Sequence, residues 1–280
     1  MSRYRPEVRV LHGSLDTERI LWRVLSLMPT NSYSSLCDDF YIDMYVNTEL
    51  DLPTARDTIL TFFERIQKQF PTMGRFARRE NGEYCLEEDP VSGQSRWVSL
   101  EGDRVGSGAV NPSSVEEVYE QDRLVLELMP YMLGVTPLDV DSVDVTFAMD
   151  FDCAGNHDEV IAEALFATSA FGWLLDWPHV KPIVYSPSMV VTLSADEYTQ
   201  ARVSIESKTS IFEPGEKEQT RDEAITLSLT VRQYPKGNER FDPVASFERQ
   251  CQLAEELMNE RIIRHFVQPL TEAIAQRRSP

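Results

Sequence analysis

The chain has 280 residues, which is enough to bury a substantial core as one large domain or two small ones. Its 46 acidic and 27 basic side chains give a formal net charge of -19, a field that repels polyanions and argues against non-specific binding to DNA or RNA. No apolar run has the length of a membrane-spanning helix, and no apolar segment follows the charged N-terminus as in a signal peptide. We therefore expect a cytoplasmic protein without a membrane contact.

The four cysteines lie far apart and form no Cys-x-x-Cys pair, which gives little support to a disulfide framework or a zinc ribbon. Reduced, buried thiols in the cytoplasm are the better interpretation. These residues are Cys37, Cys85, Cys153 and Cys251.

Residues 1–37 form an N-terminal extension in this interpretation. Ser14 or Asp16 can cap a short helix whose apolar side chains recur on one side, and Pro29 ends that helix. A polar loop from Thr30 to Ser35 follows.

A first unit is predicted over residues 38–134, and it begins with a strand. From Phe40 to Val46, aromatic and aliphatic residues alternate as they do on a strand of a sheet. A helix from Pro53 to Phe70 follows, because Pro53 suits a first helical turn and apolar residues recur at helical spacing until Pro71.

Four short strands and a second helix complete this unit. The turns between the strands include Asn81-Gly82, the strongest two-residue hairpin signal. Ser113 or Ser114 caps the helix, which Pro130 could kink and which ends before Gly134. The predicted strands are Gly74–Arg78, Glu83–Glu87, Arg96–Glu101 and Arg104–Val110.

The second unit, residues 135–280, repeats this order from about Asp141. A long strand has apolar residues on one face from Val143 to Phe151, and Asn156 caps a helix that runs to Leu175. Further strands are expected at Ile183–Tyr185, Met189–Ser194, Thr199–Ser207 and Ala224–Tyr234, with a charged loop before the last of them.

A long helix closes the chain. Asp242 as N-cap with Pro243 in the first turn is a good start signal, and apolar residues recur from there to about Gln276. Pro269 should bend or interrupt this helix, because it has no N–H group to donate.

Each unit therefore has the order β-α-β4-α. We predict an α+β fold in which this tandem pseudo-repeat forms one curved, mostly antiparallel sheet with helices on one face. The opposite face should be partly open, because polar residues alternate along its strands.

The order of elements over residues 38–277 resembles the duplicated saddle fold of the TATA-binding protein. The sequence is also similar to a sporadic group of uncharacterised bacterial proteins of about this size, in which a comparable strand, a Gly-Asn-His-Asp stretch and a C-terminal helix occur in this order. Here the stretch is Gly155-Asn156-His157-Asp158. The first resemblance implies a saddle-shaped sheet, and neither one implies a catalytic residue.

Acidic residues and a histidine gather where the second long strand leads into its helix. Asp150 and Asp152 would share one strand face, and His157 and Asp158 follow at the helix start, so oxygen ligands and one imidazole could hold a divalent cation. An EF-hand is rejected, because its last ligand position would be Ile161. The alternative is a capped helix whose acids favour the positive end of the helix dipole.

Two other patterns favour structure over chemistry. The stretch from Gly102 to Gly108 lacks the Gly-Lys-Ser/Thr ending of a phosphate loop, and Val105 and Val110 suggest a strand edge whose glycines let the sheet twist or bulge. No Gly-x-Ser-x-Gly elbow or cysteine-protease signature is present, so the catalytic residues stay unknown.

Two sets of residues are candidates for binding a partner. The first set is Tyr41, Asp43 and Tyr45 on the open sheet face. The second is Trp173 and Trp177, an aromatic cluster that can anchor a partner or, alternatively, seal the end of the core. A basic patch at Arg75, Arg78 and Arg79 either blunts a strand edge, pairs with the protein's own acids or meets a phosphate group.

These observations favour a non-enzymatic binding or assembly protein that uses an open, acidic sheet face. The expected partner is a protein or a basic segment, because an acidic field speeds such an encounter. The competing hypothesis is a metal-dependent enzyme or metal-binding protein built on Asp150, Asp152, His157 and Asp158. No cofactor is expected under the first hypothesis, whereas the second requires a divalent metal.

Overall fold

The computed structural model describes residues 32–90, 93–207, 224–237 and 240–278. The helix predicted between Ser14 and Met28 and the whole loop predicted between Glu213 and Glu223 lie outside these residues. The described part of the first half contains a short 3-10 turn, five strands and two long helices: η1 (Tyr33–Ser35), β1 (Asp39–Thr48), α2 (Arg56–Gln69), β2 (Arg75–Arg78), β3 (Tyr84–Glu87), β4 (Ser95–Glu101), β5 (Arg104–Val110) and α3 (Val115–Met132).

The second half again begins with a long strand and ends in helix. Its elements are β6 (Val140–Phe151), α4 (His157–Phe166), α5 (Gly172–Leu175), β7 (Ser188–Thr192), β8 (Thr199–Ser207), β9 (Ile225–Gln233), α6 (Pro243–Leu257), the π-helical η2 (Met258–Val267) and α7 (Gln268–Arg278).

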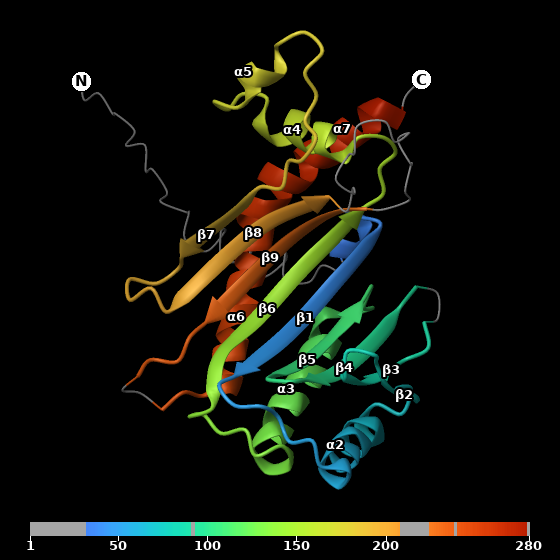
Figure 1. The fold of residues 1–280 in the computed structure, drawn as a ribbon, viewed down its shortest axis with the longest axis vertical. Helices are drawn as coiled ribbons and strands as arrows, with labels where there is room; N and C mark the ends of the chain where they lie inside the picture. The colour runs from blue at the N-terminus through green and yellow to red at the C-terminus, as the bar shows by residue number, and fades with distance from the viewer. Residues whose placement is uncertain (1–31, 91–92, 208–223, 238–239, 279–280) are drawn as a thin grey trace, which may run out of the picture.

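The described strands form one nine-stranded sheet in the order β2-β3-β4-β5-β1-β6-β9-β8-β7, and every neighbouring pair is antiparallel. The long strands β1 and β6 lie at its centre, and each half of the chain builds outward from its own long strand (Figure 1). The predicted α+β class with one antiparallel sheet is confirmed. In its described residues the second half has three strands after its first helix instead of the predicted four, because Ile183–Tyr185 is not a strand.

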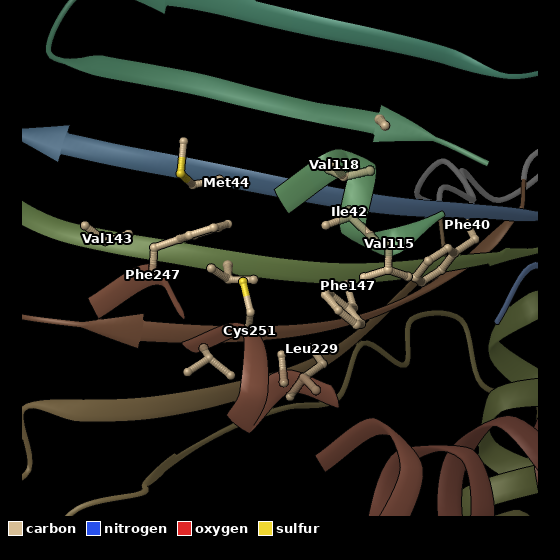
Figure 2. Packing of buried hydrophobic residues seen from close by; sticks show 14 of the residues in the cluster. Phe40, Ile42, Met44, Val115, Val118, Val143, Phe147, Leu229, Phe247 and Cys251 are labelled. Carbon is tan, nitrogen blue, oxygen red and sulfur yellow. The ribbon is translucent and has the colours of Figure 1, made fainter. Parts of the chain in front are cut away.

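The core lies between this sheet and helices α3 and α6. Alternate residues of β1 are fully buried on the side of these helices, as the strand pattern predicts. α3 packs against β5 and β1, and α6 packs against β6 and β9, so the helices cover one face (Figure 1). Figure 2 shows how buried side chains of these elements pack together in the core: Phe40, Ile42 and Met44 from β1, Phe147 from β6, Val115 and Val118 from α3, and Phe247 and Cys251 from α6.

The opposite face of the sheet, here called the outer face, has no helix packed on it among the described residues (Figure 1). Tyr33, just before β1, belongs to the covered side. Its ring lies 5.2 Å from that of Phe40 and 5.8 Å from that of Phe147, and its hydroxyl donates to Asn259 Oδ1 at 3.2 Å. The part of the predicted extension that is described therefore adds to the core and leaves the outer face open.

Two predicted helix caps are confirmed. The Asn156 side chain accepts from the N–H of Glu159 at 3.1 Å, and the Asp242 side chain accepts from the N–H of Ala245 at 3.1 Å. The predicted role of Pro53 is wrong, since α2 begins at Arg56.

The first helix of the second unit is shorter than predicted. It ends at Phe166, and the Ser169 hydroxyl donates to the Phe166 carbonyl at 2.8 Å. The chain then turns so tightly that a Cβ atom on Gly172 would collide with the carbonyl of Ala167. A hydroxyl that bonds to the backbone competes with helical hydrogen bonds, which explains a break that apolar periodicity alone does not predict.

The C-terminal helix continues through Pro269 but changes its hydrogen bonding before that residue. Over Met258–Val267 it is π-helical, and the N–H of Gln268 donates to the carbonyl of Ile263, five residues earlier. The interruption predicted at Pro269 is thus a stretch of wider, π-helical turns just before that residue, and α7 continues after it. No described helix is both long enough and apolar enough to cross a membrane.

Candidate functional site

The four residues of the predicted metal site lie in different surroundings. Asp150 belongs to the outer face, where its carboxylate accepts from the Thr226 hydroxyl at 2.6 Å and from the Tyr41 hydroxyl at 3.0 Å. Asp152 is exposed just past β6, and its N–H donates to the carboxylate of Asp38 at 2.7 Å.

His157 and Asp158 are buried at the start of α4. The Nε2 atom of His157 lies 2.7 Å from the carbonyl oxygen of Cys153. Asp158 accepts from the N–H of Tyr185 at 2.6 Å and from the Ser207 hydroxyl at 3.4 Å. These contacts attach the start of α4 to the segment before β7 and to the end of β8. Nowhere in the described part of the chain do three or more His, Cys, Asp or Glu side chains gather as metal ligands would.

The metal hypothesis leads to a simple experiment. We expect the melting temperature to stay unchanged when Ca²⁺, Mg²⁺, Mn²⁺ or Zn²⁺ is added, because the four side chains are separated. A bound ion at one hundred times its dissociation constant would stabilise the fold by about 2.7 kcal/mol. A rise in melting temperature that Asp152→Ala and His157→Ala each abolish would contradict this expectation and support the metal hypothesis.

The other predicted set lies together on the outer face. Tyr41, Asp43 and Tyr45 alternate along β1 with the buried residues, and all three are partly accessible. In the sheet register, Asp43 lies opposite Gly108 of β5 and Thr146 of β6. Because β1 is a central strand, these residues lie in the middle of the face.

Trp97 of β4 completes a group that we call the central cluster: Asp43, Tyr45 and Trp97. The indole ring covers two glycines of β5, since a Cβ atom on Gly106 would lie 2.8 Å from Trp97 Cζ3 and one on Gly108 would lie 2.9 Å from Trp97 Cζ2. The Tyr45 and Trp97 ring centroids are 5.8 Å apart. The glycines thus let side chains of β1 and β4 meet across the strand between them.

Within the central cluster, the carboxylate of Asp43 is poorly hydrated. Burial raises the pKa of Asp43 to about 7, and a hydrogen bond from the Trp97 side chain opposes this rise only in part. Burial, together with the charge of Asp43, also raises the pKa of Tyr45 to about 12. Within the described chain, no Lys, Arg or His side chain forms an ion pair with Asp43.

Two other carboxylates of the outer face have strong partners. Asp144 receives two hydrogen bonds of 2.6 Å from Arg232, and Asp150 is held by the two hydroxyls described above. Around them the face is rich in hydroxyl groups, such as Thr146 and Thr230, whose oxygens are 2.8 Å apart. Among the described residues, Asp43 has neither the cationic partner of Asp144 nor the two hydroxyl donors of Asp150.

A groove of about 440 Å³ begins beside the central cluster and runs over β2, β3 and β4. Its lining includes the rings of Tyr45 and Trp97 and the charged side chains of Arg75, Arg79, Arg96, Glu83, Glu87 and Glu88. The basic patch predicted at Arg75, Arg78 and Arg79 is largely paired with the protein's own acids. Arg79 binds Glu83 at 3.2 Å, Arg75 lies 3.8 Å from Glu87, and Arg78 lies over the ring of Tyr84.

The sequence prediction missed Trp97; it placed the glycines in the right strand, Arg104–Val110, but at an edge. β5 is an interior strand between β4 and β1, so the interpretation of Val105–Val110 as a sheet edge is wrong. The signal was present as two glycines spaced by one residue within a strand, which is typical of a place where something lies close against the backbone. The residue that fills this space is separated from them by a turn and could not be assigned from spacing.

Trp173 and Trp177 lie far from the central cluster, at α5 and in the loop after it (Figure 1). Their exposed fractions are 64% and 70%, so the interpretation that they seal the core is wrong.

Compared with known proteins, the chain matches no protein-family model and shows no significant similarity to a curated protein. The geometry and chemistry of the outer face are therefore the basis for the function proposed next.

Proposed function

We propose that this is a non-enzymatic binding protein whose outer face receives a basic segment of a partner protein. A lysine or arginine of that segment pairs with Asp43 between the rings of the central cluster. The observation that supports the proposal is a desolvated carboxylate in the middle of an uncovered sheet face, without a cationic partner among the described residues.

A cation suits this place for two physical reasons. It restores the charged form of Asp43, which burial alone disfavours. It also gains from the negative faces of the neighbouring rings, as Arg104 does at 4.8 Å from the centre of the Tyr45 ring. Thr146 on the neighbouring strand β6 and Thr230 on β9 beyond it have hydroxyls that offer further acceptors for a guanidinium group.

The charge of the whole chain favours a basic polypeptide over a nucleic acid. A net charge of -19 attracts a basic segment from a distance and repels a phosphate backbone. The groove beside the cluster, which contains both arginines and glutamates, would hold the residues that flank the inserted cation.

The proposal is tested with a lysine-rich peptide, titrated into the protein by calorimetry at several salt concentrations. We expect Asp43→Asn to weaken binding at least tenfold, because it removes the charged partner of the cation. Glu206→Gln is the matched control, since Glu206 is an exposed acid of the same face, opposite Thr226. It removes one negative charge as well and should change the affinity less than twofold. Equal effects of the two substitutions would show that only net charge matters and would overturn the proposal.

The pH dependence of the same titration gives a second measure. Because the pKa of Asp43 is raised to about 7, the carboxylate must lose a proton before it can bind the cation at lower pH. Affinity should therefore rise about tenfold from pH 6 to pH 8. Asp43→Asn should abolish this rise, and Glu206→Gln should retain it.

A further inference from the structure

β7 is the outermost strand on one side of the sheet, and among the residues that the structure describes nothing gives it the usual protection of an edge. All five of its residues are exposed and none is charged. Met189, Val190 and Val191 follow one another with exposed fractions of 66%, 57% and 43%. Natural edge strands avoid unwanted pairing through charges, proline, bulges or a covering element.

The opposite edge has such protection. β2 has four residues, of which Arg75 and Arg78 are charged. A guanidinium group at an edge disfavours the approach of a second strand, so the two edges of one sheet differ in chemistry.

The ladder between β7 and β8 shows which backbone groups of β7 point outward. The N–H of Ile205 donates to the carbonyl of Pro187 at 3.0 Å, and the N–H of Leu193 donates to the carbonyl of Thr199 at 2.8 Å. Because hydrogen-bonded residues alternate along an antiparallel strand, the odd-numbered residues of β7 bond to β8. The backbone groups of Ser188, Val190 and Thr192 therefore face away from the sheet.

The sequence of β7 is complementary to itself. If two copies pair antiparallel about Val190, Val190 lies opposite Val190, Ser188 lies opposite Thr192, and Met189 lies opposite Val191. Each pair joins side chains of like size and polarity. The three outward-facing residues are also the ones that exchange hydrogen bonds in this register. An interface about a two-fold axis requires this kind of self-complementarity.

The segment before β7 is suited to the same contact. Between Glu163 and Asp196, Asp176 and Lys181 are the two residues with a formal charge, whereas the whole chain has a net charge of -19. Two copies can therefore approach here with little local repulsion. Large apolar side chains of this segment are exposed, namely Phe171, Trp173, Leu174, Trp177, Ile183 and Val184.

We propose that the protein is a dimer in which β7 pairs with β7 of a second copy, antiparallel and centred on Val190. Stable interfaces bury at least about 1,200 Å² in total, which is more than a five-residue ladder supplies, so the exposed apolar segment of residues 171–184 contributes as well. The two-fold axis is perpendicular to the sheet, which places both outer faces on the same side of the assembly.

Light scattering coupled to size exclusion tests the pairing. The wild type should have twice the chain mass of 32.1 kDa. Val190→Lys and Val190→Glu should each give monomers, because like charges then lie directly opposite one another. An equimolar mixture of the two variants should recover the dimer mass, since opposite charges now meet at the same pair. Recovery also shows that each variant is folded.

Arg78→Glu is the matched control, because it changes a charge on the opposite edge and should leave the dimer intact. A monomeric wild type would overturn the proposal. A dimer that survives Val190→Lys, or variants whose mixture stays monomeric, would overturn the register centred on Val190.

Discussion

Replacing Gly108 with alanine is expected to lower the free energy of unfolding by about 3 kcal/mol, the upper part of the range for overpacking a well-filled site. The new Cβ atom would collide with Oδ1 of Asp43 and lie 2.7 Å from the carbonyl oxygen of Ile42 and 2.9 Å from the Trp97 ring. The Ile42 oxygen belongs to the backbone of the central strand β1, which cannot move without disturbing its ladders with β5 and β6. Urea denaturation followed by circular dichroism measures the loss.

Gly74→Ala is the control for this substitution. A Cβ atom there would approach nothing closer than the Thr72 carbonyl oxygen at 3.9 Å. We expect a change within about 0.5 kcal/mol, as for an ordinary surface substitution. If Gly108→Ala were equally harmless, Trp97 would not be held against β5 as described, and the central cluster would lose its structural basis.

Asp43→Asn is expected to stabilise the protein at pH 8 by about 2 kcal/mol more than at pH 5. The unfolded carboxyl loses its proton near its ordinary pKa of 3.8, whereas burial raises the folded pKa to about 7. Between these values the unfolded state binds fewer protons than the folded state, so the free energy of unfolding falls as pH rises. Asparagine does not titrate and can still accept the hydrogen bond from Trp97, so the variant lacks this loss.

The measurement is a pair of denaturant titrations at each pH. Asp122, fully buried on α3, also has a pKa raised by burial and gives a pH slope of the same sign, so the difference between variant and wild type is the relevant quantity. Glu206→Gln, an exposed carboxylate of the same face, should change stability by less than about 0.5 kcal/mol at either pH. A variant that is equally stabilised at both pH values would contradict a raised pKa for Asp43.

Local sequence patterns predicted the parts of the fold that depend on neighbouring residues. The alternation along β1 and β6 correctly predicted which apolar residues lie in the core. The caps at Asn156 and Asp242 predicted the first residues of two helices correctly. Both signals act within a few residues of the chain. The break after Phe166 was missed because it depends on a hydroxyl that competes with helical bonds, which apolar spacing does not reveal.

The candidate site was predicted only in part, for a related reason. Tyr41, Asp43 and Tyr45 share a face by strand periodicity alone. Trp97 joins Asp43 only because β5 lies between β4 and β1 and has glycines at the two crossing points. That order of strands is a long-range property. The four residues of the predicted metal site show the opposite case. They are close in sequence, but among the described residues their side chains do not gather as metal ligands would.

The duplication of a half-chain unit stays a prediction, to which the structure adds one parallel. Gln121 of α3 is fully buried and donates to the carbonyls of Trp97 and Gly108 at 3.1 and 3.3 Å. Gln250 of α6 is also buried and donates to the carbonyls of Val143 and Val231 at 2.6 and 2.8 Å. Each unit thus has a glutamine in its last long helix that binds two strands of its own half of the sheet.

The pairing of β1 with β6 has a consequence for the origin of such a protein. Either half of the chain alone would expose the inner edge of its long strand together with apolar residues such as Phe40 or Phe147. Such a half would associate with another copy through that edge. If the halves descend from one gene, the seam that now lies within a single molecule was first a contact between two separate ones. Fusion then converted a concentration-dependent association into a permanent one.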